Sequence, residues 1–597
     1  MTSFERQSVT AIAAEVGAGR RRATDVAGEV LARVAAYETV QPAVWILRRP
    51  EADVIADAAA VDRRVAAGAA LPLAGVPFAV KDNIDVAGLP TTAGCPAFAY
   101  TPAETAAVVR RLIDAGAVLV GKTNLDQFAT GLVGARSPYG ALGAVYNRDY
   151  ISGGSSSGSA VAVAAGLVAF ALGTDTAGSG RVPAAFNHLV GLKPTKGRWS
   201  TRGVAPACRT QDCVSVFAST GAEAAVVDDV LIGFDVDDPF SRRAPDAHAP
   251  PGTRLRLGLP GPGQLNWLSD PHASRLFDRA VERLIATGAE PVEVDIEPLT
   301  AAAALLYQGP WVAERTLVAE PLLRTRPGAI EPTVRAILQS GFALSAMDAF
   351  RADYELRAHQ RAAEAIWAKA DVLVLPTTAT TYRLREVIAE PFTLNSNLGL
   401  YTNFVNLLDM SAVALPAGFR DNATGFGVSL IGPAWADRAL LDLARRYEEI
   451  APMPEAPPID TEGVKPSVRL AVVGAHLAAM PLHWQLTSRD ARLVRRCKTA
   501  PAYKLYAMAA ATPPKPALVH VGAGGAAIEV EVYELGVEAF GSFVVDVPPP
   551  LAIGTVTLDD GVDVKGFVAE PRALDGAQDI TALGGWRAYI ASLAPAG

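Results

Sequence analysis

The sequence predicts an α/β fold for most of the chain and a smaller α+β domain after it. Short apolar runs alternate with amphipathic helical stretches, a proline-rich stretch interrupts this alternation at residues 451–467, and the chain has 597 residues. A single hydrophobic core rarely grows beyond about 250–300 residues, so more than one domain is expected. The chain opens at residues 1–65 with apolar residues at helical spacing, which predicts an amphipathic helical start.

Strand-like and helical segments alternate from Leu73 onward. GVPFAVKD and AVLVGKT flank the helical AETAAVVRRLIDAG, and the same order returns in LRLGLPG, ASRLFDRAVERLIATGA and PVEVDI, followed by ADVLVLPTT and SAVALPAGF. The order strand, helix, strand indicates α/β units with a largely parallel sheet. The helical ADRALLDLARRYEEI then ends a first domain that we place at residues 1–450.

Residues 451–467 contain five prolines and predict a stiff, extended linker. The chain beyond this linker has a different character. VRLAVVGAH, VHVGAGGAAIEVEVYELG and LAIGTVTLDDGVDVKGFVAE are strand-like and separated by turn residues, which suggests a mixed or antiparallel sheet. We therefore expect a separate α+β domain at residues 468–597.

Composition argues against several classes of partner. The formal net charge is −8 and no dense Lys/Arg tract occurs, so a nucleic-acid partner is not expected. Four scattered cysteines argue for a reducing compartment rather than a disulfide framework. The first residues form no apolar signal segment, and the longest small-apolar run, residues 159–173, is shorter than the roughly 20 residues needed to span a bilayer. A cytoplasmic protein without a membrane partner is expected.

Residues 152–195 carry the chemistry. GGSSSGS could be a flexible linker, but a helical apolar segment and a second glycine-rich turn, LGTDTAGSG, follow it directly, which favours a buried scaffold. Small residues before Ser179 let the backbone N–H groups of Thr176, Ala177 and Gly178 converge on a carbonyl oxygen that becomes negative. Ser179 would then be the nucleophile. The alternative is that Ser179 only caps the next helix.

A serine nucleophile needs a base. The chain has seven histidines, of which His188 is nearest, and spacing alone does not exclude a Ser-His-Asp arrangement, although no GxSxG motif is present. Lys81 is the other candidate, because it ends an apolar run where a strand would meet a loop. Such a lysine acts as a base only when burial and neighbouring dipoles bring its pKa from about 10.4 to about 7–8. The alternative for Lys81 is a buried ion pair with Asp82 or Asp85.

Together, GVPFAVKDNID, GGSSSGSA and GTDTAGSGRVPAAFNHLVGLKPT resemble the amidase signature family, strongly over residues 60–220 and in outline over most of residues 1–450. The resemblance implies a mixed-sheet α/β core covered by helices, and a catalytic triad of Lys81, Ser155 and Ser179. Ser155 would follow a cis peptide bond and relay the proton between Lys81 and Ser179. No metal or organic cofactor is implied, and no ligand-spaced His/Cys cluster is visible.

Within that family, LYQGPWVAERTLV and AVVGAHLAAMPLHWQL are similar to the subgroup that hydrolyses allophanate, a small anionic amide. This resemblance implies that Tyr307 and Arg315 grip the substrate carboxylate, a task that suits the planar guanidinium. Eight residues span just over two helical turns, so both side chains would share one face of a single helix.

The same resemblance implies a cyclotransferase-like C-terminal domain, in which His476 is the candidate working residue and a structural histidine is the alternative. It further implies a homodimer and functional coupling to a urea carboxylase in urea or cyanuric acid degradation. Three other functions stay open: a broader amidase, the amidase component of a glutamine-dependent tRNA amidotransferase, and a non-catalytic scaffold.

Overall fold

The computed structural model describes residues 4–245, 255–452, 454–461, 467–509 and 513–593. The chain divides into two compact units, residues 1–461 and 462–597, and each is described by itself. Part of the expected linker, residues 453 and 462–466, lies outside the described residues. The described remainder of that stretch belongs to the first unit, because the Asp460 N–H donates to Val145 O at 2.9 Å and Ile459 packs against the core.

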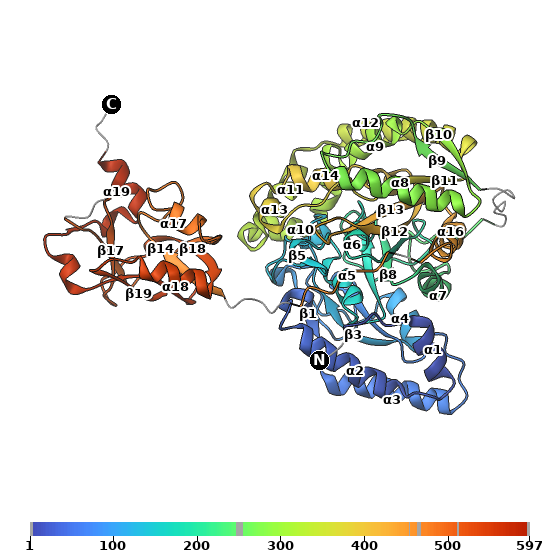
Figure 1. Cartoon of the computed structure of the whole chain (residues 1–597), viewed down its shortest axis with the longest axis horizontal. Coiled ribbons are helices and arrows are strands. Elements are labelled where there is room, and N and C mark those ends of the chain that lie inside the picture. The colour runs from blue at the N-terminus through green and yellow to red at the C-terminus, as the bar shows by residue number, and fades with distance from the viewer. Residues whose placement is uncertain (1–3, 246–254, 453, 462–466, 510–512, 594–597) are drawn as a thin grey trace. The chain divides into compact units, whose positions relative to one another are not determined.

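The first unit is built on an 11-stranded sheet (Figure 1). In spatial order its strands are β1 (Trp45–Arg48), β3 (Val118–Thr123), β2 (Pro77–Lys81), β6 (Phe170–Asp175), β8 (Cys213–Ala218), β7 (Val190–Lys193), β12 (Ser411–Phe419), β13 (Gly425–Gly432), β11 (Val372–Pro376), β9 (Arg256–Pro260) and β10 (Glu290–Val294). A separate two-stranded ribbon joins β4 (Gly143–Ala144) and β5 (Asn147–Ile151).

The sheet is mixed, as the family resemblance implied, and the largely parallel sheet expected from the strand–helix alternation is wrong. β2 runs parallel to β3 and β6, and β9 runs parallel to β10 and β11. Between these two parallel groups, β6, β8, β7, β12, β13 and β11 pair antiparallel. Alternation along the chain reports only that a helix intervenes, not the direction in which the next strand enters.

Helices cover this sheet, and their positions follow the apolar spacing of the sequence. The first unit contains α1 (Val9–Gly17), α2 (Ala23–Tyr37), α3 (Glu51–Ala66), α4 (Ala107–Asp114), α5 (Ser157–Ala164), α6 (Val182–Phe186), α7 (Gly221–Leu231), α8 (Pro271–Ala286), α9 (Glu297–Gln308), α10 (Trp311–Thr325), α11 (Pro332–Ser340), α12 (Ala346–Lys369), α13 (Leu384–Ala389), α14 (Thr393–Leu398), α15 (Asn403–Leu407) and α16 (Asp437–Glu449). Every residue of α5 is buried. The GGSSSGS stretch is therefore scaffold and not a tether.

The second unit contains a 5-stranded sheet in the order β15 (Arg492–Lys498), β18 (Glu529–Gly536), β14 (Ser467–Val472), β20 (Asp563–Ala569) and β19 (Leu551–Thr557). A 3-stranded sheet contains β17 (Pro516–His520), β16 (Tyr503–Ala507) and β21 (Gln578–Asp579). The helices α17 (Trp484–Thr487), α18 (Val537–Val545) and α19 (Trp586–Ser592) complete it. All strand pairs are antiparallel except β14 with β20, so this unit has the expected mixed α+β character.

Candidate active site

Lys81 is the last residue of β2 and is fully buried. Its amine donates to Ser155 Oγ at 2.6 Å and to Thr174 Oγ1 at 2.7 Å. Thr174 lies in the neighbouring parallel strand β6, so the sheet itself brings the lysine and the loop that follows β6 to one edge.

Burial lowers the pKa of Lys81 to about 7, against the upward pull of Asp126, Asp212 and Asp175. A substantial fraction of the amine is therefore uncharged at neutral pH, which a general base requires. The alternative ion pair is not formed. Asp82 lies 2.9 Å from Lys122 Nζ, and Asp85 accepts hydrogen bonds of 2.8 Å from the hydroxyls of Thr91 and Tyr100.

Ser155 lies in a turn whose backbone is held by a hydrogen bond to Asp126. The peptide bond between Gly154 and Ser155 is cis. The Ser155 carbonyl accepts from Asp126 N–H at 3.0 Å, and the Asp126 carboxylate accepts the N–H groups of Val133 and Gly134 at 3.1 and 3.0 Å. A Cβ on Gly154 would stand 2.1 Å from Asp126 Oδ2, so this turn requires glycine.

Ser179 lies in the loop after β6. The Asp175 carboxylate fixes this loop by accepting backbone N–H groups on both sides of Ser179. Asp175 accepts the N–H groups of Gly178 and Gly180 at 2.9 and 3.0 Å and pairs with the buried Arg181 at 2.9 Å. Burial raises the pKa of Asp175, but Arg181 more than offsets this and the net shift is downward. Asp175 therefore stays charged and keeps the loop in place on both sides of Ser179.

The Ser179 side chain is almost buried, and its hydroxyl makes no hydrogen bond to any residue that the structure describes. The structure thus joins Lys81 to Ser155 directly and leaves the Ser179 hydroxyl without a partner in the described part of the chain. Ser179 is also not a helix cap, because the N-cap of α6 is Arg181. The capping interpretation is wrong.

The candidate oxyanion donors differ in one position from the expectation. Among the described residues, the backbone N–H groups of Thr176, Ala177 and Ser179 donate to no protein acceptor, whereas Gly178 N–H is taken by Asp175 Oδ1. Glycine is required at position 178 for another reason: its φ is 125°, and a Cβ there would stand 2.5 Å from Thr402 Oγ1. The sequence could not separate Gly178 from its neighbours, because which N–H group the Asp175 carboxylate takes depends on how the loop after β6 folds.

His188, the nearest histidine in sequence, does not serve Ser179. Its ring stacks on Phe419 with a centroid distance of 4.5 Å. Burial lowers the pKa of His188 to about 3, so it stays neutral. The local candidate for a Ser-His-Asp arrangement is therefore a packed structural residue.

Tyr307 and Arg315 meet, but not on one helix. Gly309 and Pro310 end α9 and begin α10, so Tyr307 lies near the end of one helix and Arg315 in the next. The single-helix expectation is wrong because the proline supplies no backbone N–H to continue α9. The guanidinium still lies over the Tyr307 ring, 5.1 Å from its centroid.

The Arg315 guanidinium is buried and largely unpaired. Its Nη1 donates to Ala129 O at 3.5 Å, while Nε and Nη2 have no hydrogen-bond partner in the described protein. A buried cation with free donors is costly unless an anion binds there. Tyr307 and Arg136 line a cavity of about 300 Å³, whose lining includes neither Arg315 nor any of the three expected triad residues.

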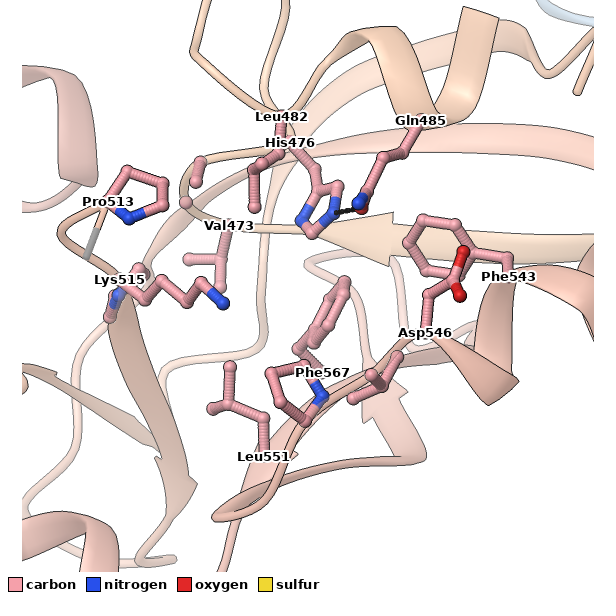
Figure 2. Close-up of a pocket in the computed structure, with 15 residues that line it drawn as sticks. Val473, His476, Leu482, Gln485, Pro513, Lys515, Phe543, Asp546, Leu551 and Phe567 are labelled. Atoms are coloured by element: carbon pink, nitrogen blue, oxygen red, sulfur yellow. Dashed lines mark hydrogen bonds between the residues drawn. The ribbon is translucent and has the colours of Figure 1, made fainter. Parts of the chain in front are cut away.

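His476 stands in a second cavity, in the C-terminal unit, of about 120 Å³. Figure 2 shows His476 beside Gln485 and above Phe567, with Lys515 across the cavity. His476 Nε2 lies 2.8 Å from Gln485 Oε1, and the ring stacks on Phe567 at 5.0 Å. Burial lowers the pKa of His476, so a neutral imidazole faces this cavity.

The site residues that sequence reasoning missed include Asp126, Thr174, Asp175 and Asp212. Thr174 and Asp175 belong to the TDT of GTDTAGSG, and their place at the end of an apolar strand was the available signal. Asp212 lies far along the chain and reaches the site only through β8. Within the ranges that the structure describes, no His, Cys, Asp and Glu cluster could hold a metal ion. No helix in those same ranges is long and apolar enough to cross a bilayer.

Comparison with known proteins identifies the families that the two units match. The amidase family model matches residues 29–441, and the model of the allophanate hydrolase C-terminal domain matches residues 468–591. A urea amidolyase of Saccharomyces cerevisiae is 44% identical over 546 residues, covering 88% of this chain and 30% of its own length. The chain thus spans about a third of that relative.

Two further relatives are matched over nearly their whole length. The solved structure of Kluyveromyces lactis allophanate hydrolase is similar with a TM-score of 0.71 and 41% identity, covering 99% of this chain and 100% of that one. A glutamyl-tRNA(Gln) amidotransferase subunit of Deinococcus deserti is 36% identical, covering 74% of this chain and 96% of its own length.

Proposed function

Because this chain belongs to the amidase family, we propose that it hydrolyses the terminal amide of allophanate and so serves urea or cyanuric acid degradation. The observation that carries this substrate is Arg315, a buried guanidinium with two free donor atoms. A carboxylate can accept from both donors at once, and the Tyr307 ring supports the cation from one face. A neutral amide would leave this charge without a counter-ion.

In the proposed mechanism, neutral Lys81 removes the Ser155 proton while Ser155 takes the proton of Ser179. Ser179 Oγ bonds to the amide carbon, and the backbone N–H groups of Thr176, Ala177 and Ser179 stabilise the oxyanion. The C–N bond then breaks, and the proton returns from Lys81 through Ser155 to the nitrogen, which leaves as ammonia. Water hydrolyses the acyl-enzyme by the same relay and releases N-carboxycarbamate, whose decarboxylation gives carbon dioxide.

Other functions of the family have less support. The tRNA amidotransferase relative matches this chain over 74% of its length, whereas the Kluyveromyces lactis allophanate hydrolase matches 99% of it and therefore both units. A broader amidase would not require the unpaired Arg315. A non-catalytic scaffold does not require a deprotonated lysine beside a serine hydroxyl.

The cavity beside His476 supports a second proposal for the C-terminal unit. We propose that this unit acts on the carboxylated product of the first step, with His476 as its working residue. A neutral imidazole and the Lys515 amine line the same small cavity. The amine could bind a small anion there, and the imidazole could exchange a proton with it. Coupling to a urea carboxylase belongs to the same proposal, since the yeast relative is a urea amidolyase. A homodimer and a cytoplasmic location are proposed from the sequence and its family resemblance alone.

Ammonia release from purified protein tests the substrate. Allophanate is compared with malonamate, which keeps the carboxylate, and with propionamide, which lacks it. We expect allophanate and malonamate to be hydrolysed and propionamide to react at least about 100-fold more slowly, as expected when a buried charge is left unpaired. Faster hydrolysis of propionamide than of allophanate would overturn the substrate assignment.

A further inference from the structure

Asp212 is a buried carboxylate beside the candidate active site that the proposed mechanism does not use. It directly precedes β8, and its side chain accepts the hydroxyl hydrogen of Thr176. It also accepts the N–H of Ala207 at 2.8 Å and the N–H of Cys208 at 3.1 Å. Both oxygens of the carboxylate are therefore occupied by donors of the protein.

Thr176 and Ala177 precede Ser179, and among the described residues neither backbone N–H group has a protein acceptor. The Thr176 side chain is the one that Asp212 holds. This β-branched side chain restricts rotation about the Cα–Cβ bond, so a fixed hydroxyl also restrains the backbone to which it is attached. The next residue, Ala177, is held by a different contact, because its carbonyl accepts from Thr402 Oγ1 at 2.7 Å. The two free N–H groups are thus held by contacts that do not use the N–H groups themselves.

The Asp212 carboxylate is hydrogen-bonded to its hydroxyl and backbone donors and not to Arg315, the proposed carboxylate-binding residue. Among the described residues no ion pair joins Arg315 to a carboxylate, and its Nε and Nη2 have no hydrogen-bond partner. Because Thr176, Ala207 and Cys208 donate to both Asp212 oxygens, the two open donors of Arg315 remain for the carboxylate of the proposed substrate.

We propose that Asp212 is a positioning residue that, through the Thr176 hydroxyl, aims the backbone N–H groups of Thr176 and Ala177 at the developing oxyanion. This inference rests on the proposed function only for the identity of the reacting carbonyl. The geometry from which it is argued does not depend on that function. In this proposal Asp212 acts through the Thr176 hydroxyl and not on the substrate itself.

Thr176→Val removes the hydroxyl and keeps the shape of the side chain, whereas Thr176→Ser keeps the hydroxyl. A matched control exists in the same unit, where buried Asp437 accepts from Thr195 N–H at 2.7 Å and Thr195 Oγ1 at 2.6 Å. With malonamate, we expect Thr176→Val to lower kcat by about 10- to 100-fold, because misaligned oxyanion donors lose part of the roughly 10²–10³-fold effect of one donor. KM should stay within about threefold. Thr176→Ser should recover most of kcat, and Thr195→Val should leave kcat unchanged.

A second measurement does not depend on the natural substrate. A fluorophosphonate labels an activated serine when Ser179 Oγ bonds to phosphorus, the P–F bond breaks and fluoride leaves, while the serine proton passes to the Lys81 relay. Its negative phosphoryl oxygen needs the same N–H donors. We expect labelling to slow in Thr176→Val and in Asp212→Asn, but not in Asp437→Asn. Melting temperatures measured alongside separate loss of folding from loss of alignment.

The outcomes separate the two claims. If the wild type is labelled but hydrolyses neither allophanate nor malonamate, the proposed function fails and the labelling rates still test Asp212. If folded Thr176→Val keeps kcat and labelling within about threefold of the wild type, the inference about Asp212 is wrong. It is equally wrong if Asp437→Asn slows labelling as much as Asp212→Asn does.

Discussion

Lys81 Nζ lies 2.6 Å from Ser155 Oγ, whereas the carboxylate that follows it in the chain, Asp82, lies beside Lys122 Nζ at 2.9 Å. The local sequence Lys-Asp would allow the two neighbours to pair. Because successive residues at the end of a strand point in opposite directions, each finds a partner on a different side of the sheet. Lys81 is thereby left without a salt bridge to any residue that the structure describes.

The first prediction concerns pH. The proposed base is active only when uncharged, and burial lowers the pKa of Lys81 to about 7. We therefore expect kcat/KM to rise with pH through about 7 and to level off above it, with a slope near one on the acid side. A pH–rate profile with malonamate measures this. A profile that is flat from about pH 5.5 to about pH 8.5 would show that no group with this pKa acts as the base.

The second prediction is that Lys81→Met abolishes activity and stabilises the fold. The folded pKa of Lys81 is lower than the unfolded value of 10.5, so the unfolded chain binds an extra proton between about pH 7 and pH 10.5. Folding stability therefore rises with pH across that window, and at neutral pH the buried amine destabilises the fold. We expect Lys81→Met to gain on the order of 2–4 kcal/mol at about pH 7.5 by denaturant titration, and less at about pH 10.

A control for this stability measurement is Lys122→Met. It removes a lysine that is equally buried but paired with Asp82. Loss of one partner of a buried pair costs about 3–5 kcal/mol, so this variant should lose stability. If Lys81→Met is also less stable than the wild type, the amine contributes favourable bonds that exceed its burial cost, and the neutral-lysine argument weakens.

The third prediction concerns Arg315. Arg315→Lys keeps a positive charge but loses the planar pair of donors, and Arg315→Ala loses both. We expect kcat/KM for malonamate to fall by about 10²-fold for the lysine variant and by about 10³-fold or more for the alanine variant. Turnover of propionamide should change far less.

Arg324 on the same helix α10 provides the control, because it is exposed and pairs with Glu320 at 2.9 Å. Arg324→Ala should leave both substrates unaffected. An equal loss of malonamate and propionamide turnover in Arg315→Ala would indicate a structural role and contradict carboxylate binding.

The fourth prediction concerns the two units. Residues 1–461 contain every group of the proposed amide hydrolysis and form a compact unit, so we expect this fragment to fold and to release the first ammonia. Full-length His476→Ala should do the same, with carbon dioxide release lagging behind ammonia release. His520→Ala, in the same C-terminal unit and packed against Tyr503, should behave as the wild type. Simultaneous release of both products by His476→Ala would assign that histidine to structure.

Much of the site could be read from the sequence, because its residues lie in short, dense segments. Lys81 ends an apolar run, and Ser155 and Ser179 lie in glycine-rich turns that flank a wholly buried helix. Glycine spacing and apolar patterning are local properties, so residues that lie within such patterns can be identified from the sequence. The bounds of α16 and of β2 and β3 follow the expected segments for the same reason, whereas β6 lies where the sequence predicted a helical segment and a glycine-rich turn.

Only the tertiary structure decided which of these groups are partners. That Gly178 N–H is occupied by Asp175, that Tyr307 meets Arg315 across a helix break, and that Asp212 reaches Thr176 from the start of β8 are contacts that depend on the fold. The mixture of parallel and antiparallel strands in the sheet also depends on the fold. The sequence alone determined the residue types, the local elements and the candidate lysine and serines. Strand direction and hydrogen-bond competition depend on how distant segments pack, and no local pattern encodes them.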